Sequence, residues 1–190
     1  MITTPLGYIV GRVYNNHELF SSTQSSSAAL QQNAVVYTPI FIYQDVVIDA
    51  LIINCSTAGS NAIVDFGLYS NVSGVPGSLI VDAGSADLST KGNKLNVIPA
   101  TTLKAGWYWG AISATTWTTA PSITTGGGTY ALTSLLGTRA GYASGAVAAY
   151  VEPSNALSLP PSSGVSNPPS PSEEVFAQAP MMWYRVSSVV

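Results

Sequence analysis

The chain has 190 residues; 46% are hydrophobic, only 8% are charged, and the formal net charge is −3. Since about 25% of residues are charged in an average soluble protein, we expect a neutral polar surface, burial against other subunits, or both. The six basic residues are scattered, which argues against a nucleic-acid-binding protein, because phosphate contacts need clustered Lys and Arg.

Residues 1–33 are expected to form an N-terminal arm and a polar link. The apolar segment 8–14 is compatible with a first strand or with an arm that packs on a neighbour. Residues 21–33 are small and polar, which is typical of a surface loop or a flexible link, and a short helix over residues 27–32 is the alternative. The first residues lack a basic region followed by an apolar one, so we expect no secretory signal.

Residues 34–190 are predicted to form a β-sheet body with about eight short strands. Runs rich in Val, Ile, Tyr, Phe and Trp are separated by Gly, Pro and Asn, which is the pattern of strands and turns. The expected strands cover residues 35–43, 45–55, 62–70, 79–83 (extended by 86–88 in one interpretation), 95–98, 106–113, 147–151 and 181–190. The strand at 45–55 is mostly apolar on both faces, so we expect it to be central and covered on both sides.

Prolines and glycines refine this prediction. Pro39 indicates an edge position or a bulge in its strand, and Pro99 indicates the end of its strand. Pro76 and Gly77 suit positions i+1 and i+2 of a type II turn, so we expect a turn over residues 74–77.

Two long segments are predicted to lack regular structure. Residues 115–129 form a Thr- and Gly-rich loop, and loops of this length usually bind or pack on something. Residues 152–180 are rich in Pro and Ser, which predicts an extended loop, partly polyproline II, draped on the body or on a neighbour. We therefore predict an all-β fold: a two-sheet antiparallel β-sandwich, jelly-roll-like, with an extended N-terminal arm and a Pro/Ser-rich C-terminal loop before the final strand.

The residue types that catalyse reactions or bind metals form no recognisable constellation. His17 is the only histidine and no Gly-x-Ser-x-Gly segment accompanies it, so we expect no catalytic triad. The single cysteine, Cys55, is expected to be a small buried residue, and one His with one Cys makes no metal-ligand cluster. No Gly-rich phosphate loop is present. We expect no catalytic residue, metal or cofactor; a glycosidase that uses two carboxylates is the enzymatic alternative.

The aromatic residues provide the candidate binding contacts. Trp107 and Trp109 share one face of their expected strand, and we expect them to fill the core, because large aromatic side chains dominate core burial. Trp117, in the Thr-rich loop, is the better candidate for an exposed contact that stacks on a sugar ring. Together with Tyr130 it is the predicted glycan contact.

The segment from residue 30 to residue 112 resembles a pattern seen in tailed-bacteriophage virion proteins. In that pattern, Gly-x-Tyr is followed by Gly-x-Pro-Gly and later by Leu-x-x-Gly-x-Tyr-Trp. The residues that match it are Gly67, Tyr69, Gly74, Pro76, Gly77, Leu103, Gly106, Tyr108 and Trp109. The resemblance implies a β-sandwich module of tail-fibre or capsid-decorating proteins. Because turn and core residues carry it, it transfers the fold better than the function.

The resemblance and the low charge together imply a non-enzymatic structural protein on the exterior of a bacteriophage particle. We expect a capsid decoration (cement) or head-fibre subunit, made in the host cytoplasm and located in the virion. Its expected partners are copies of itself, as a homotrimer, and other virion proteins such as the major capsid protein or tail proteins. We expect no nucleic acid and no membrane insertion. The alternative is a tail-fibre or receptor-binding component that recognises host-surface carbohydrate.

Overall fold

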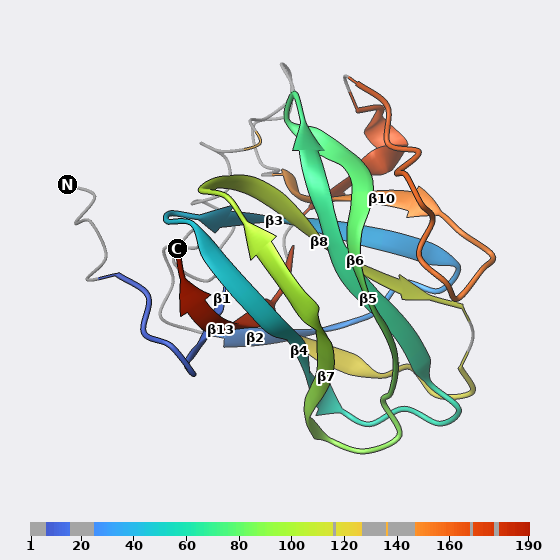
Figure 1. Ribbon diagram of the computed structural model, residues 1–190. Coiled ribbons are helices and arrows are strands. Elements are labelled where there is room, and N and C mark those ends of the chain that lie inside the picture. The colour runs from blue at the N-terminus through green and yellow to red at the C-terminus, as the bar shows by residue number, and fades with distance from the viewer. Residues whose placement is uncertain are drawn as a thin grey trace.

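The computed structural model describes residues 7–15, 25–115, 117–126, 136, 147–167, 169–176 and 179–190. These residues form two sheets, with every pairing antiparallel, packed as a sandwich (Figure 1). The fold class predicted from the sequence is confirmed. Within the described part of the chain, no helix has the length and apolarity needed to cross a membrane.

The chain alternates between the two sheets at most connections. Sheet 1 has the order β1 (Val13–Asn15), β13 (Met182–Val189), β4 (Val46–Thr57), β9 (Ser122–Gly126) and β12 (Ala179–Pro180). Two further strands join this sheet: β2 (Ser25–Ala29) pairs with β9, and β7 (Gly92–Leu103) pairs with β4. Sheet 2 has the order β11 (Glu174–Phe176), β10 (Val147–Pro153), β3 (Ala34–Ile42), β8 (Gly106–Ala114), β5 (Ile63–Val72) and β6 (Val75–Asp87). A short 3₁₀ helix, η2 (Pro171–Glu173), precedes β11.

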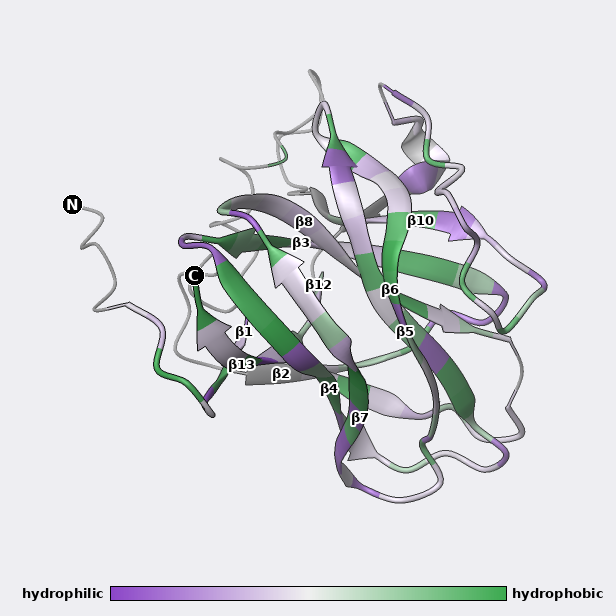
Figure 2. Cartoon of the chain, viewed as in Figure 1, coloured by the Kyte–Doolittle hydropathy of each residue, from purple (hydrophilic) through white to green (hydrophobic). Residues whose placement is uncertain are grey.

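The main core lies between the sheets, because the strands of both turn one apolar face inward. β4 pairs with β13 on one side and with β7 on the other, so its predicted central position is confirmed, and it is largely coloured hydrophobic in Figure 2. The predicted cover on both faces is only partly found: on the outer face Ala50 and Ile52 are buried, but Val47, Asp49 and Asn54 are half-buried. The largest buried members of the core are Ile40, Ile42, Ile48, Leu51, Ile53, Phe66, Leu68, Leu88, Leu103 and Ile112.

A second apolar cluster lies on the opposite, outer face of sheet 2. Its strand residues are Val35, Tyr37, Tyr69, Val75, Trp109, Ala111 and Tyr150, and Leu159 and Val165 cover them from the segment 154–170, here called the covering segment. The backbone N–H of Leu79 in β6 donates to the carbonyl of Pro161 at 2.9 Å. The Pro/Ser-rich loop is therefore draped on the body of its own chain.

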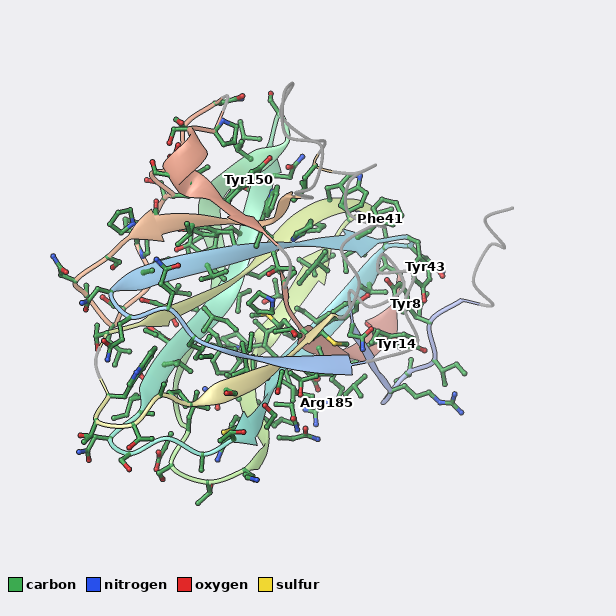
Figure 3. The ribbon with its side chains drawn as sticks, turned by 180° about the vertical axis from the view of Figure 1, so that it is seen from behind. Tyr8, Tyr14, Phe41, Tyr43, Tyr150 and Arg185 are labelled. Carbon is green, nitrogen blue, oxygen red and sulfur yellow. The ribbon has the colours of Figure 1, made fainter. Side chains whose placement is uncertain are left out.

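The described part of the N-terminal arm packs on sheet 1. β1 pairs with β13, and the ring of Tyr8 stacks on Tyr43 with centroids 4.1 Å apart. The hydroxyl oxygens of Tyr8 and Tyr184 lie 2.8 Å apart, and Figure 3 shows Tyr8, Tyr14 and Tyr43 gathered at this end of the molecule. Aromatic packing therefore fastens the arm to the sandwich.

The turn predicted at residues 74–77 lies elsewhere. β5 and β6 are joined by the two residues Ser73 and Gly74, with φ values of 52° and 91°, and two positive φ values characterise the type I′ hairpin turn. Gly77 is a strand residue, at which a Cβ would lie 2.6 Å from Cγ2 of Val72. The prediction was wrong because close packing, as well as positive φ, can require glycine.

Four other expectations about strands were wrong. Residues 152–180, predicted to lack regular structure, contain β11 and β12. β7 continues through Pro99, which lies where the pairing with β4 shifts register, and such a bulge tolerates the missing N–H. Residues 122–126, predicted as loop, form β9, and residues 25–29, predicted as polar link, form β2, which pairs with β9. These two strands are rich in Ser and Thr, so they lack the apolar alternation that reveals a strand.

Candidate functional site

A pocket of about 310 Å³ opens on the outer face of sheet 2 beside the covering segment. Four parts of the chain build it: strands β3, β8 and β10, the β5–β6 hairpin at its turn, Leu136, and the end of the covering segment. The lining residues are Pro39, Asn71, Ser73, Gly74, Val75, Trp107, Trp109, Leu136, Tyr150, Asn167 and Pro169.

Aromatic rings form one wall of this pocket. Trp107 and Trp109 are two residues apart in β8, so their side chains leave the same face of the strand. Trp109 is buried, and its ring centroid lies 5.1 Å from that of Tyr150. Trp107 is half-buried, and its ring lies 4.8 Å from that of Phe41, a residue 37% exposed. Trp107 therefore presents more ring surface to solvent than Trp109 does.

Amide and hydroxyl groups form the polar part of the pocket. Oδ1 of Asn71 accepts a hydrogen bond from Nε1–H of Trp109 at 2.9 Å, and no described residue accepts from its Nδ2. The side chains of Ser73 and Asn167 are exposed at the rim. None of the described lining residues carries a charge, so the pocket is polar but uncharged as far as the structure describes it.

A carboxylate holds the part of the covering segment that carries Asn167. The oxygens of Glu173 accept hydrogen bonds from the backbone N–H and the hydroxyl of Ser166, at 2.7 and 2.6 Å, and from the N–H of Ser170 at 2.6 Å. Desolvation raises the pKa of Glu173, but these hydrogen bonds outweigh it and lower the pKa to about 2. The carboxylate is therefore ionised at neutral pH and fixes the loop.

Two buried carboxyl groups fasten the rest of the covering segment. Glu152 accepts a hydrogen bond from the Tyr37 hydroxyl at 2.6 Å and another from the N–H of Gly164. Asp65 accepts from the N–H of Leu159 at 3.4 Å. Burial, and then the charge of Asp82, raise the pKa of Asp65, and burial raises that of Tyr37. Neither carboxyl group is among the described residues that line the pocket, so both hold the covering segment on sheet 2.

Trp117, the predicted glycan contact, lies away from this pocket. Its ring is half-buried and packs against the main core. When the side-chain oxygen of Gln32 faces it, that oxygen accepts from Nε1–H of Trp117 at 3.1 Å. Tyr130 and His17 lie outside the described residues, so the predicted contact at Tyr130 stays a prediction.

Cys55 is buried, as predicted. Desolvation raises the pKa of its thiol, and its sulfur lies 3.2 Å from the carbonyl oxygen of Thr57. Among the described residues, no three His, Cys, Asp or Glu side chains lie close enough to hold a metal ion.

Sequence reasoning missed Asn71, Tyr150 and Asn167 as pocket residues. The shared face of Trp107 and Trp109 was predicted, and both rings were assigned to the core. Trp109 is buried in the second apolar cluster, as predicted, whereas Trp107 is only half-buried. The sequence feature that could have indicated the pocket was the spacing of the two tryptophans together with the polar turn that follows Asn71. Nothing in the sequence pairs that turn with Asn167, because backbone hydrogen bonds bring the covering segment to the sheet.

Comparison with known proteins identifies no relative by sequence. No family model matches the chain, and no curated protein matches it. Among solved structures, the chain is similar to the cysteine protease and lectin-like domains of Cwp84, a surface layer associated protein of Clostridium difficile. The identity is 12% and the TM-score is 0.46, over 84% of this chain and 36% of that one. The chain thus spans little more than a third of that structure, and a likeness at this level carries no functional argument.

Proposed function

We propose that the protein is a non-enzymatic structural subunit of the exterior of a bacteriophage particle, a capsid decoration (cement) or head-fibre protein. It would act by packing against copies of itself and against neighbouring virion proteins. The observation that carries this proposal is an apolar row on the outer face of sheet 1, in which Ile52 is buried but Leu95 and Val97 are exposed.

This face is formed by cross-strand neighbours on the outer side of β13, β4 and β7. Ile52 pairs with Trp183 on one side and with Leu95 on the other, and paired residues share a face. The adjacent residues Leu51 and Ile53 point into the main core, so this row points outward. Val97 extends it; Leu95 is 45% exposed and Val97 is 70% exposed.

The charges beside this row neutralise each other. Nε of Arg185 lies 2.6 Å from Oδ1 of Asp49, and Arg185 pairs with Ala50, the β4 neighbour of Val97. An apolar face beside an ion pair whose charges cancel is better suited to contact a neutral protein surface than to bind a charged ligand.

Several residues that carry the resemblance to virion proteins pack together on sheet 2, while Leu103 ends β7 of sheet 1. Tyr69 of β5 pairs with Trp109 of β8, and both side chains are buried. Gly67 lies so close to β6 that a Cβ there would meet the carbonyl of Val81 and Cδ1 of Leu159. Packing therefore constrains Gly67, Tyr69 and Trp109, whereas Gly74 and Gly106 have positive φ and open space around them. This supports a shared module and leaves its role to be tested.

Oligomeric state in solution tests the packing role. We expect the purified wild-type protein to elute as an oligomer, with a trimer the expected size, in size-exclusion chromatography with light scattering. The double substitution of Leu95→Asp and Val97→Asp should yield monomers, because it places charges in the contact. Val72→Asp is the matched control, since Val72 is 53% exposed but lies in sheet 2. A monomeric wild-type protein, or a double variant that assembles as the wild type does, would contradict the packing role.

The location on the particle tests the virion assignment. Antibody against the chain, viewed by electron microscopy on particles of the encoding phage, should label the head surface at its symmetry axes. Label on the tail would favour the receptor-binding alternative. Particles without label would exclude both.

A further inference from the structure

We propose that the pocket between the β5–β6 turn, β8 and the covering segment binds a neutral saccharide, with one pyranose ring against Trp107. This site goes beyond the packing role and does not depend on it, because it lies on the outer face of sheet 2 while the apolar face belongs to sheet 1.

The aromatic wall suits the apolar face of a sugar ring. A pyranose presents C–H groups on its faces and hydroxyl groups around its edge. Trp107 is half-buried and braced by Phe41, so it offers a flat surface whose position is already fixed. The quadrupole of an indole ring, negative on its face, attracts C–H groups directed at that face. Trp109 and Tyr150 close the inner end of the same wall.

The polar groups that line the same pocket suit hydroxyl groups. Nδ2 of Asn71 has two N–H donors, and the hydrogen bond that Oδ1 accepts from Trp109 holds the amide in one orientation. The side chains of Ser73 and Asn167 add groups that both donate and accept. Sugar hydroxyls are also both donors and acceptors, so amides and hydroxyls can pair with neighbouring hydroxyls of one ring.

The lack of charge on the described lining residues favours neutral saccharides over anionic ones. The described lining residues include no cationic side chain, so an anionic ligand would lose hydration without gaining an ion pair there. We therefore assign a neutral hexose or N-acetylhexosamine, in preference to a uronic acid or a phosphorylated sugar. The volume of about 310 Å³ is at the lower end for ligand pockets. A terminal residue or a disaccharide fits this size better than a long internal stretch of polymer.

The walls are held in place without a ligand. The turn that carries Ser73 closes a β-hairpin, Trp107 lies within a strand, and the loop that carries Asn167 is tied through Glu173. Groups that are ordered before binding lose less conformational entropy when the ligand arrives.

The test uses the full chain and defined saccharides. We would titrate the protein calorimetrically with the methyl glycosides of glucose, galactose, mannose and N-acetylglucosamine, and with methyl glucuronide as the anionic comparison. A microarray of bacterial-surface oligosaccharides would extend the range. We expect at least one neutral glycoside or a neutral-ended oligosaccharide to bind, and the glucuronide to bind more weakly.

Three pocket variants and one control assign the binding to this site. Trp107→Ala should weaken binding by about tenfold or more through loss of stacking, and Trp107→Phe, which keeps an aromatic face, should restore part of the affinity. Asn167→Ala should weaken binding without changing the melting temperature, because its side chain is exposed. Trp183→Ala removes a half-buried tryptophan from the other sheet and should leave the affinity unchanged.

Three results would each overturn the proposal: no saccharide binds, only anionic saccharides bind, or binding survives in a folded Trp107→Ala protein. Because these measurements need neither oligomers nor phage particles, a failure here is distinct from a failure of the packing role.

Discussion

The two sheets differ in what covers their outer faces. On sheet 2, the covering segment lays Leu159 and Val165 over the strands and makes a second apolar cluster. On sheet 1, the row that contains Ile52, Leu95 and Trp183 has no such layer among the described residues, and Val97 is 70% exposed. Both faces present apolar side chains, but on sheet 1 Leu95 and Val97 stay exposed although Ile52 beside them is buried.

The difference shows that the alternating pattern of a strand predicts which face is apolar, but does not predict which segment, if any, packs on that face. The segment that covers sheet 2 is rich in Pro and Ser and has no apolar periodicity. Prolines have no N–H to satisfy and are restricted in φ, so an extended Pro-rich segment can lie on a sheet with fewer unpaired donors and a smaller loss of chain entropy.

Removing an anchor of the covered face should cause the largest loss of stability. In Tyr69→Ala, a fully buried ring that packs edge-on against Tyr37 at 5.2 Å is lost. We expect the free energy of unfolding to fall by about 3–5 kcal/mol, measured by urea denaturation followed by tryptophan fluorescence. A loss below about 1 kcal/mol, the scale of an ordinary surface change, would mean that the covered face is not a core.

Filling the space between sheet 2 and its cover should have a smaller effect. A Cβ at Gly67 would meet the carbonyl oxygen of Val81 and lie 2.7 Å from Cδ1 of Leu159, so Gly67→Ala must push the cover or β6 outward. We expect a loss of about 1–3 kcal/mol from overpacking. Denaturation midpoints measure it, and faster hydrogen exchange at the N–H of Leu79, which bonds to Pro161, would locate the displacement. Unchanged exchange there would contradict this explanation.

Removing the charge of Asp82 should stabilise the covered face, and only above acidic pH. Burial, and then Asp82, raise the pKa of Asp65. A carboxyl group whose pKa is raised on folding contributes stability below its unfolded value near 4, which is lost as the pH rises through the folded pKa. Asp82→Asn should therefore add about 0.3–1 kcal/mol at pH 7, a modest gain because Asp82 is exposed. Below pH 4 the gain should disappear, because Asp65 is then protonated.

A matched change separates this effect from general loss of charge. Asp87 is also an exposed carboxylate of β6. Both carboxylates accept one backbone N–H, Asp82 from Gly84 and Asp87 from Ser89, each at 2.7 Å. Asp87 accepts in addition from the hydroxyl of Ser89, and its bonds to Ser89 lower its pKa. Asp87→Asn should reduce stability at pH 7. Thermal unfolding of both variants at pH 3 and pH 7 measures the contrast; two changes of the same sign at pH 7 would refute it.

Changing the uncovered face should alter the stability of the chain least. Val97→Ser replaces a largely exposed side chain, so we expect the free energy of unfolding of the monomer to stay within about 0.5 kcal/mol. The same variant should weaken self-association if this face packs against a copy. Denaturation at low protein concentration, compared with light scattering at high concentration, distinguishes the two effects. A large loss in the dilute monomer would show that Val97 is covered within its own chain.

The sequence allowed most of the central strands to be predicted, because they bury apolar side chains at regular spacing. β4 is the clearest example, with Leu51 and Ile53 facing the main core and Ile52 facing outward. β2 and β9 were missed because backbone hydrogen bonds between distant Ser- and Thr-rich segments form them. Such pairing leaves little trace in side-chain periodicity.

The candidate site was predicted less well than the fold. Trp107 and Trp109 were correctly placed on one face of a strand, but their outer environment depends on a segment about fifty residues later in the chain. Trp117 was expected to be exposed because it follows a strand in a polar region. In the structure it packs on the main core beside Gln32. Solvent exposure of one aromatic residue depends on such long-range neighbours, which local sequence does not specify.

The buried position of Cys55 has a practical consequence for mapping assemblies. Its thiol is sealed in the core, with a raised pKa, so maleimide reagents should spare it in the native protein. A cysteine introduced at Val97 would then be the single reactive handle on the chain. Spin labels attached there would report the distance between neighbouring copies directly, without first removing the native sulfur.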